Sequence, residues 1–384
     1  MLQPIVGWTR HWAEGEIKMN KCYLCGNIIT DENKTVEHIL LNSVGGRLKS
    51  STLICKKCNS TFGNTFDSSL SKQLEFFANF LDIKRERGVV QEVEMIKEST
   101  GEKYKVTSKG IPIPSKPIVE EIITDTTTEI KIKARSKKEL AGILTGFKKK
   151  YPSLNIDELL ENANSVKEHI SEPLHITLTI GGKESMPAIL KMAINFYVEK
   201  TGDTESVKNA IEDLKKNSTD KVEPIIFNTP LFLLNDDEIT HSIFIKGSNK
   251  EKKLYAIIEL YSVIQFIVKL SDNYNENDIE DLYVYDVLKN TEISKKIEIL
   301  PSFDFIFSFE YPSSKPDFSI MKNKMERVMN IGAKRKTDYY ISEAIEKAMD
   351  ATWKQLPEGH LITEKDTNQL IDEIMKNIMP LFIR

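Results

Sequence analysis

The sequence has no apolar run long enough to cross a membrane. The longest apolar stretch, residues 254–270, is interrupted by Glu259, Gln265 and Lys269, and its wealth of Tyr, Val and Ile favours two strands buried in a sheet. Internal repeats, low-complexity tracts and the glycine-rich fingerprints of P-loop and dinucleotide-binding proteins are also absent. These absences exclude membrane-spanning, solenoid and P-loop proteins and favour ordinary globular domains.

Cysteine is scarce, and its placement is informative. The 384 residues contain four cysteines, Cys22, Cys25, Cys55 and Cys58, arranged as two C-x-x-C pairs. Disulfides are the competing interpretation, but adjacent C-x-x-C pairs without a secretory hydrophobic segment favour a reducing compartment, the cytoplasm. Four thiolates in this arrangement converge readily on one tetrahedral ion. The sequence therefore predicts a structural Zn²⁺ held by all four cysteines.

The chain also lacks a strong net charge. Its formal charge is -4, divided into +3 for residues 1–90 and -7 for the remainder. Such a module can contact phosphates locally, but the whole chain lacks the field of a strongly non-specific nucleic-acid binder. Residues 1–18 contain Trp8 and Trp12 but no signal-peptide pattern, and the sequence assigns them no role.

A ββα pattern lies between and after the two cysteine pairs. Residues 35–39 alternate like a short strand, Gly45-Gly46 breaks the chain, and the apolar residues Leu53 and Ile54 lead into the second pair. An amphipathic helix follows, with one apolar face made by Leu70, Leu74, Phe77 and Leu81. We expect a ββα unit stapled by zinc.

Three polar residues of this unit suit phosphodiester hydrolysis. A neutral imidazole such as His38 can deprotonate a water, while a hard cation stabilises charge on the phosphate and leaving oxygen. Glu37 and Asn59 are oxygen donors, which suit Mg²⁺ or Mn²⁺ rather than the zinc bound by thiolates. Asp67 can either reach the ion or cap its helix, and capping is the favoured reading.

Residues 20–82 resemble the HNH, or ββα-metal, endonucleases in the form that carries two zinc knuckles. The resemblance implies that Glu37 and Asn59 bind the catalytic divalent ion and that His38 is the general base. It also implies the catalytic set Glu37, His38 and Asn59, with Zn²⁺ as the structural ion and Mg²⁺ or Mn²⁺ as the catalytic one.

The match departs from the family pattern in two places. The acidic residue is Glu37 where Asp is commoner, so the ion would lie about a methylene farther out. The family's middle Asn would fall near residues 49–51, where none exists. Ser50 or Asn42 is the substitute expected to orient His38.

The rest of the chain predicts a mixed body. Strand patterns occur at residues 89–110, 118–134, 174–180, 225–234, 241–246, 253–270 and 281–288, and helical patterns at 136–150, 186–197, 317–330, 339–355 and 364–379. His169, His175 and His241 have no acidic partner at ligand spacing and are read as core or surface residues. A basic cluster, Arg327, Lys334, Arg335 and Lys336, is read as solvating a helix end and is the one C-terminal place expected to contact DNA.

The predicted fold class is α+β: an N-terminal zinc-stapled ββα-metal module, then a larger mixed α+β body with a mainly antiparallel sheet and C-terminal helices. The expected divisions are an extension at 1–18, a nuclease domain at 19–88, a β-hairpin and helix linker at 89–165, a regulatory or substrate-selecting domain at 166–312 and a helical segment at 313–384.

Two functions from different classes follow. The first is a bacterial HNH endonuclease that hydrolyses double-stranded DNA in restriction or phage defence, with a body that receives an activating signal or partner protein. Cleavage of both strands would predict a homodimer, because such sites act on one strand at a time. The alternative is a non-catalytic zinc-ribbon adaptor that binds nucleic acid or protein, for which Glu37 and His38 would be incidental.

Overall fold

The computed structural model describes residues 20–124, 128–164, 170, 172–311 and 317–382. Within them the protein is mixed α+β with antiparallel sheets, which confirms the predicted fold class. The extension predicted at 1–18 lies outside the described residues, and so does His169. The other predicted domain boundaries stay predictions. No helix in the described ranges combines the length and apolar character needed to cross a membrane.

The N-terminal module has the predicted order of two short strands followed by helices. Its elements are β1 (Glu37–His38), η1 (Asn42–Val44), β2 (Lys49–Ser50), α1 (Lys56–Asn64), α2 (Phe66–Gln73) and α3 (Glu75–Phe80). The strands pair antiparallel, with Glu37 opposite Ser50. A Cβ at Gly46 would lie 2.4 Å from the Leu40 carbonyl oxygen, so the turn between the strands requires glycine there.

The body is built on a six-stranded antiparallel sheet in the order β14-β13-β10-β11-β12-β9. Its strands are β9 (Val222–Ile225), β10 (Thr240–Ser248), β11 (Lys253–Leu260), β12 (Ile264–Ser271), β13 (Ile279–Asp286) and β14 (Thr291–Glu292). Helices α6 (Met186–Thr201) and α7 (Lys208–Lys215) cover one face, and α8 (Phe303–Ser308) packs on the other. The predicted pair of strands within 253–270 is confirmed as β11 and β12.

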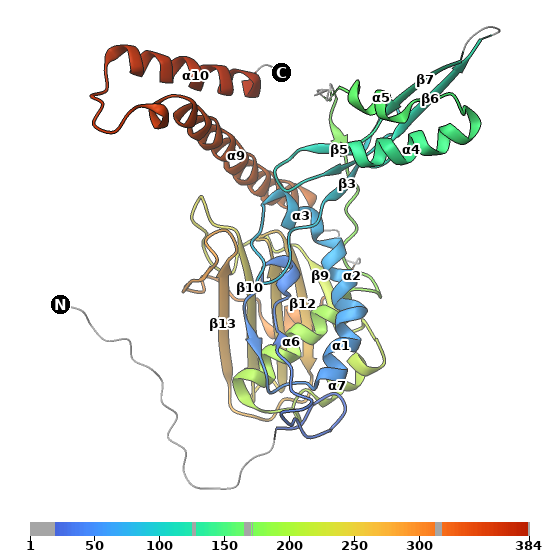
Figure 1. Cartoon of the computed structure of the whole chain (residues 1–384). Helices are drawn as coiled ribbons and strands as arrows, with labels where there is room; N and C mark the ends of the chain where they lie inside the picture. The colour runs from blue at the N-terminus through green and yellow to red at the C-terminus, as the bar shows by residue number, and fades with distance from the viewer. Residues whose placement is uncertain (1–19, 125–127, 165–169, 171, 312–316, 383–384) are drawn as a thin grey trace.

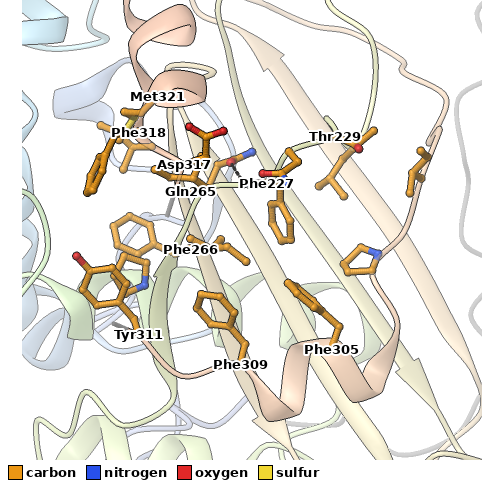
Figure 2. A pocket seen from close by; sticks show the side chains of 18 of the residues that line it. Phe227, Thr229, Gln265, Phe266, Phe305, Phe309, Tyr311, Asp317, Phe318 and Met321 are labelled. Carbon is orange, nitrogen blue, oxygen red and sulfur yellow. Dashed lines mark hydrogen bonds between the residues drawn. The ribbon is translucent and has the colours of Figure 1, made fainter. Parts of the chain in front are cut away.

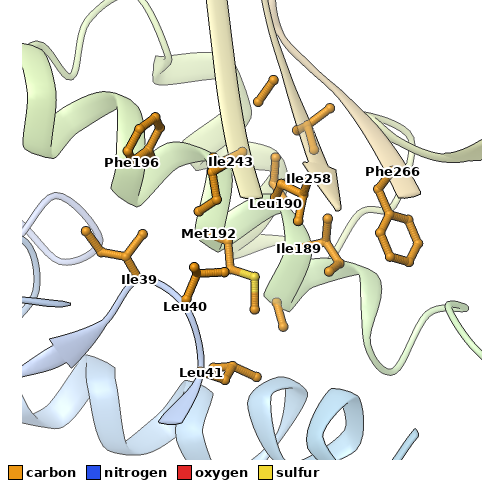
Figure 3. Packing of buried hydrophobic residues seen from close by; sticks show 14 of the residues in the cluster. Ile39, Leu40, Leu41, Ile189, Leu190, Met192, Phe196, Ile243, Ile258 and Phe266 are labelled. Atoms are coloured by element: carbon orange, nitrogen blue, oxygen red, sulfur yellow. The ribbon is translucent and has the colours of Figure 1, made fainter. Parts of the chain in front are cut away.

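Helix α6 is the centre of the core that the module and the body share. It is buried on all sides from Pro187 to Val198 because it lies between the sheet and the module. Figure 3 shows the contact: Ile39, Leu40 and Leu41 of the module approach Leu190 and Met192 of α6, and the sheet residues Ile243 and Ile258 lie beyond. One continuous apolar cluster therefore fixes the module against the body.

The remaining elements lie mainly at one end of this core and project from it (Figure 1). They are β3 (Val93–Lys97), β4 (Lys103–Val106), β5 (Pro112–Pro114), β6 (Ile118–Ile123), β7 (Thr128–Lys133), α4 (Lys137–Lys150), α5 (Ile156–Glu161), β8 (Leu174–His175), α9 (Phe318–Ala351), η2 (Trp353–Gln355) and α10 (Glu364–Phe382). Strands β5-β4-β3-β8 form one sheet and β6-β7 a hairpin.

Several predicted boundaries are wrong. The helices expected at 317–330 and 339–355 are one helix, α9, because the residues between them include Gly332 but no proline, and a single glycine does not end a helix. The helix expected through Leu81 is divided at Leu74, although its four apolar residues are all buried as predicted. The strand expected at 174–180 is confined to Leu174–His175. The strand expected at 225–234 is wrong beyond its first residue, because β9 ends at Ile225 and residues 226–234 form no strand.

Candidate active site

The four cysteines converge as predicted. One ligand atom from each of Cys22, Cys25, Cys55 and Cys58 lies within 4.8 Å of all the others, and none of them forms a disulfide. The sulfurs of Cys25 and Cys55 are 3.7 Å apart. A tetrahedral ion with Zn–S bonds of about 2.3 Å holds its sulfurs roughly 3.8 Å apart. The donor set and its spacing are compatible with a structural zinc.

Strand β1 separates the environments of Glu37 and His38. Successive side chains of a strand point to opposite sides, so Glu37 is 2% exposed while the His38 side chain retains 24% exposure. Both line a pocket of about 240 Å³ between β1 and the helices of the module. Its lining consists of Val36, Glu37, His38, Leu41, Asn42, Ser43, Asn59, Gly63, Asp67, Ser68 and Ser71. The structure thus brings Glu37, His38 and Asn59 together around one cavity.

Asn59 lies in the first turn of α1, just after the second cysteine pair. Its amide nitrogen donates hydrogen bonds to the Thr35 hydroxyl at 3.2 Å and to the Val36 carbonyl at 3.1 Å. These two bonds fix the orientation of the amide and leave Oδ1 as its acceptor. Asn59 therefore offers the pocket an oxygen whose direction is set by the strand before it.

Glu86, which the sequence reading missed, is the partner of His38. Its Oε2 lies 3.1 Å from His38 Nε2, and its Oε1 lies 2.9 Å from the Lys49 ammonium. Hydrogen bonds from Lys49 and His38 lower the pKa of Glu86 to about 2. The backbone N–H of Glu86 donates to Asn42 Oδ1 at 2.8 Å. Asn42 therefore acts on His38 only through Glu86, and Ser50 bonds Thr52 instead.

The Glu37 carboxylate is bound by two side chains of helix α6, which belongs to the body. Its Oε1 lies 2.7 Å from Lys191 Nζ and 3.0 Å from Asn195 Nδ2, both on α6, and Asn195 in turn accepts from the Tyr23 hydroxyl. Burial raises the pKa of Glu37, and the Lys191 ammonium opposes that shift. Lys191 and Asn195 are polar residues within the mostly apolar sequence of α6, and this is the sequence signal that could have identified them as partners of a buried polar group.

Asp67 does not cap its helix, so the favoured reading of this residue is wrong. Helix α2 begins at Phe66 after the N-cap Thr65, and no side chain caps it. Asp67 instead lies 2.6 Å, through Oδ2, from the same Lys191 Nζ, while its Oδ1 is buried without a hydrogen-bond partner. Burial alone would lower the pKa of Lys191, but Asp67 and Glu37 outweigh burial and raise it.

Two residues of the C-terminal basic cluster, Arg327 and Lys336, contact other parts of the protein, whereas Lys334 and Arg335 are exposed. Arg327 donates to the carbonyls of Asn235 and Glu238, and the Lys336 ammonium lies 4.4 Å from the centre of the Phe80 ring. The expectation of a solvated basic patch is therefore wrong for these two residues.

Two described histidines follow their predicted fates. His241 is fully buried, with Nε2 2.9 Å from the Val44 carbonyl oxygen and Nδ1 accepting from the Tyr261 N–H. His175 is exposed and lies 3.2 Å from Glu98. They match the core and surface roles expected from the sequence.

A second cavity, of about 570 Å³, lies at the β9 edge of the body sheet, among residues of β9, β12, α8 and the first turn of α9. Figure 2 shows phenylalanine rings gathered around it, among them Phe227, Phe266 and Phe305. The Gln265 amide is already bonded to the Phe227 N–H and to Glu259, and Asp317 caps α9. No histidine or cysteine is among its described lining residues, so the smaller pocket is the candidate for chemistry.

Comparison with known proteins identifies the module. Residues 22–75 match the model of an HNH endonuclease family, which confirms the resemblance noted for this segment. No curated protein and no solved structure matches the chain.

Proposed function

Because residues 22–75 carry an HNH endonuclease domain, we propose that the protein is a metal-dependent endonuclease that hydrolyses phosphodiester bonds of double-stranded DNA. The observation that carries the proposal is the single pocket lined by Glu37, His38 and Asn59 beside the cysteine cluster. An adaptor that only binds a partner does not require an imidazole and two oxygen donors to meet in one cavity.

His38 is the proposed general base, and Glu86 sets its tautomer. A carboxylate 3.1 Å from Nε2 favours the form in which Nε2 carries the proton and donates it to Glu86. Nδ1 then keeps its lone pair, which is the basic site needed to take a proton from water. Lys49 and the Asn42 contact hold Glu86 in place, so the orientation of His38 is determined by β2 and the segment after α3.

The proposed ligands of the catalytic ion are Glu37 and Asn59. The residues fit a hard divalent cation, because the Asn59 amide presents Oδ1 and both contacts of Glu37 are made through Oε1, which leaves Oε2. Mg²⁺ or Mn²⁺ bound there would stabilise charge on the phosphate and on the leaving oxygen. The body residues Lys191 and Asn195 orient Glu37.

We also propose where the enzyme acts and how it is controlled. Four free thiols suit zinc binding in the cytoplasm, where disulfides are rare. A body that shares its core with the module offers a route for an activating signal or a partner protein, as expected in restriction or phage defence. Breakage of both strands would require a homodimer.

Cleavage of supercoiled plasmid by the purified full chain in Mg²⁺ and in Mn²⁺ tests the function. Wild type should nick or linearise the plasmid, EDTA should stop the reaction, and His38→Ala should abolish it while keeping one zinc per chain. His175→Ala, at an exposed histidine outside the pocket, is the matched control and should cleave like wild type. Zinc binding without cleavage in either metal would support the adaptor instead.

A further inference from the structure

Asp67 is a buried carboxylate with one oxygen left unsatisfied. The residue is 8% exposed and lines the pocket that contains Glu37, His38 and Asn59. Its Oδ2 is taken by Lys191, but its Oδ1 is shielded from solvent and has no hydrogen-bond partner. A buried carboxylate oxygen without a partner is unfavourable, because no hydrogen bond or ion offsets its loss of hydration. The wall of the pocket therefore contains a carboxylate oxygen, Asp67 Oδ1, that accepts no hydrogen bond from the described protein groups.

The single positive charge of Lys191 does not neutralise the two carboxylates that it contacts. Its ammonium, fully buried on α6, is shared between Oε1 of Glu37 and Oδ2 of Asp67. Two carboxylates against one ammonium leave an excess negative charge on a group of largely buried side chains. Buried charges are normally paired or bound to metal, so this excess calls for a further cation.

We propose that Asp67 is an additional ligand of the divalent ion, through Oδ1, beside Glu37 and Asn59. The inference rests on the proposed function and adds a residue to its metal site. The three oxygens come from three elements, Glu37 from β1, Asn59 from α1 and Asp67 from α2. Three protein oxygens leave positions for water and phosphate, which is the arrangement Mg²⁺ and Mn²⁺ favour.

The competing explanation is that Asp67 serves only as a salt-bridge partner of Lys191. The two explanations differ in what Asp67→Asn does. Removing this charge leaves Lys191 paired with Glu37 and makes the buried group neutral, so the fold should survive. A ligand role predicts loss of metal binding, whereas a salt-bridge role predicts a change in stability alone.

Titration of Mn²⁺ into the full-length, zinc-loaded protein by calorimetry separates them. We expect Asp67→Asn to weaken Mn²⁺ binding by about tenfold or more, since even outer-shell partners of a metal contribute about 10–100-fold. Asp82→Asn is the matched control, because Asp82 also pairs with a lysine, Lys109, at 2.7 Å but does not line the pocket. It should bind Mn²⁺ like wild type, and all three proteins should retain one zinc.

Wild-type affinity for Mn²⁺ in Asp67→Asn would overturn the inference. Asp67→Ser supplies a second uncharged variant, and either one that folds is sufficient. The titration measures binding rather than cleavage, so His38→Ala should bind Mn²⁺ normally. If wild type cleaves DNA and Asp67→Asn binds Mn²⁺ equally well, only this inference fails. If wild type itself binds no divalent ion beyond zinc, the proposed function fails.

Discussion

His241 connects the stability of the protein to pH through its contact with the N-terminal module. The ring lies between β10 and the Val44 carbonyl of η1, and burial lowers its pKa from 6.5 to about 4, although the hydrogen bond to Val44 opposes the shift. The folded protein therefore keeps His241 neutral in a range where the unfolded chain binds a proton. Because the unfolded state binds more protons between these two values, stability falls as the pH is lowered from about 6.5 to about 4.

The size of the effect follows from the two pKa values. Between pH 7 and pH 5 the unfolded state gains about 2 kcal/mol relative to the folded state from this one group. His241→Gln removes the titrating ring and retains a donor for the Val44 carbonyl. It should be less stable than wild type at pH 7, because the Tyr261 N–H loses its acceptor, but should lose about 2 kcal/mol less on acidification.

Urea unfolding at pH 7 and pH 5 measures this difference. Tyr261→Phe is the matched control, because it removes another hydrogen bond to the same Val44 carbonyl without removing the histidine. It should be destabilised at both pH values and keep the pH dependence of wild type. Equal pH dependence in wild type and His241→Gln would show that protonation of His241 does not contribute to unfolding in this pH range.

The remaining predictions concern packing and zinc. Gly332→Ala should destabilise the protein by about 1–3 kcal/mol in thermal or urea unfolding, because its Cβ would lie 2.2 Å from the Phe80 ring. Gly142→Ala, at a helical glycine with open space around it, should stabilise by up to about 1 kcal/mol, and equal effects at the two sites would contradict the packing. Zinc removal with a strong chelator should abolish cleavage until Zn²⁺ is returned, whereas Mg²⁺ alone should not restore it. Full activity in the zinc-free protein would show that the cysteine cluster has no structural role.

The parts of the site that are close in sequence could be predicted. The cysteine pairs, Glu37-His38 and Asn59 lie within one short segment, where spacing restricts the geometry. Glu86 and Lys191 could not be assigned, because their contacts depend on how distant elements pack. The same limit explains the incorrect reading of Asp67, whose local sequence suits a helix cap while its carboxylate pairs with α6.

The helices and strands likewise include some that could be predicted from the sequence and some that could not. The buried strands β11 and β12 of the body were predictable, because residues 253–270 form an almost continuous apolar run rich in Tyr, Val and Ile. The continuity of α9 was not predicted, because Gly332 and the basic residues after it interrupt the apolar pattern. Gly332 packs closely against the Phe80 ring, which Lys336 also contacts, and such contacts between distant segments cannot be read from the sequence.

The proposed role of His38 as general base is measured by the nicking rates of wild type and His38→Ala in Mg²⁺, with and without added imidazole. We expect His38→Ala to nick about 10²–10⁴-fold more slowly, because that is the usual contribution of a positioned base, and to recover partly when imidazole supplies the missing group. Nicking at the wild-type rate by His38→Ala would show that His38 is not the base.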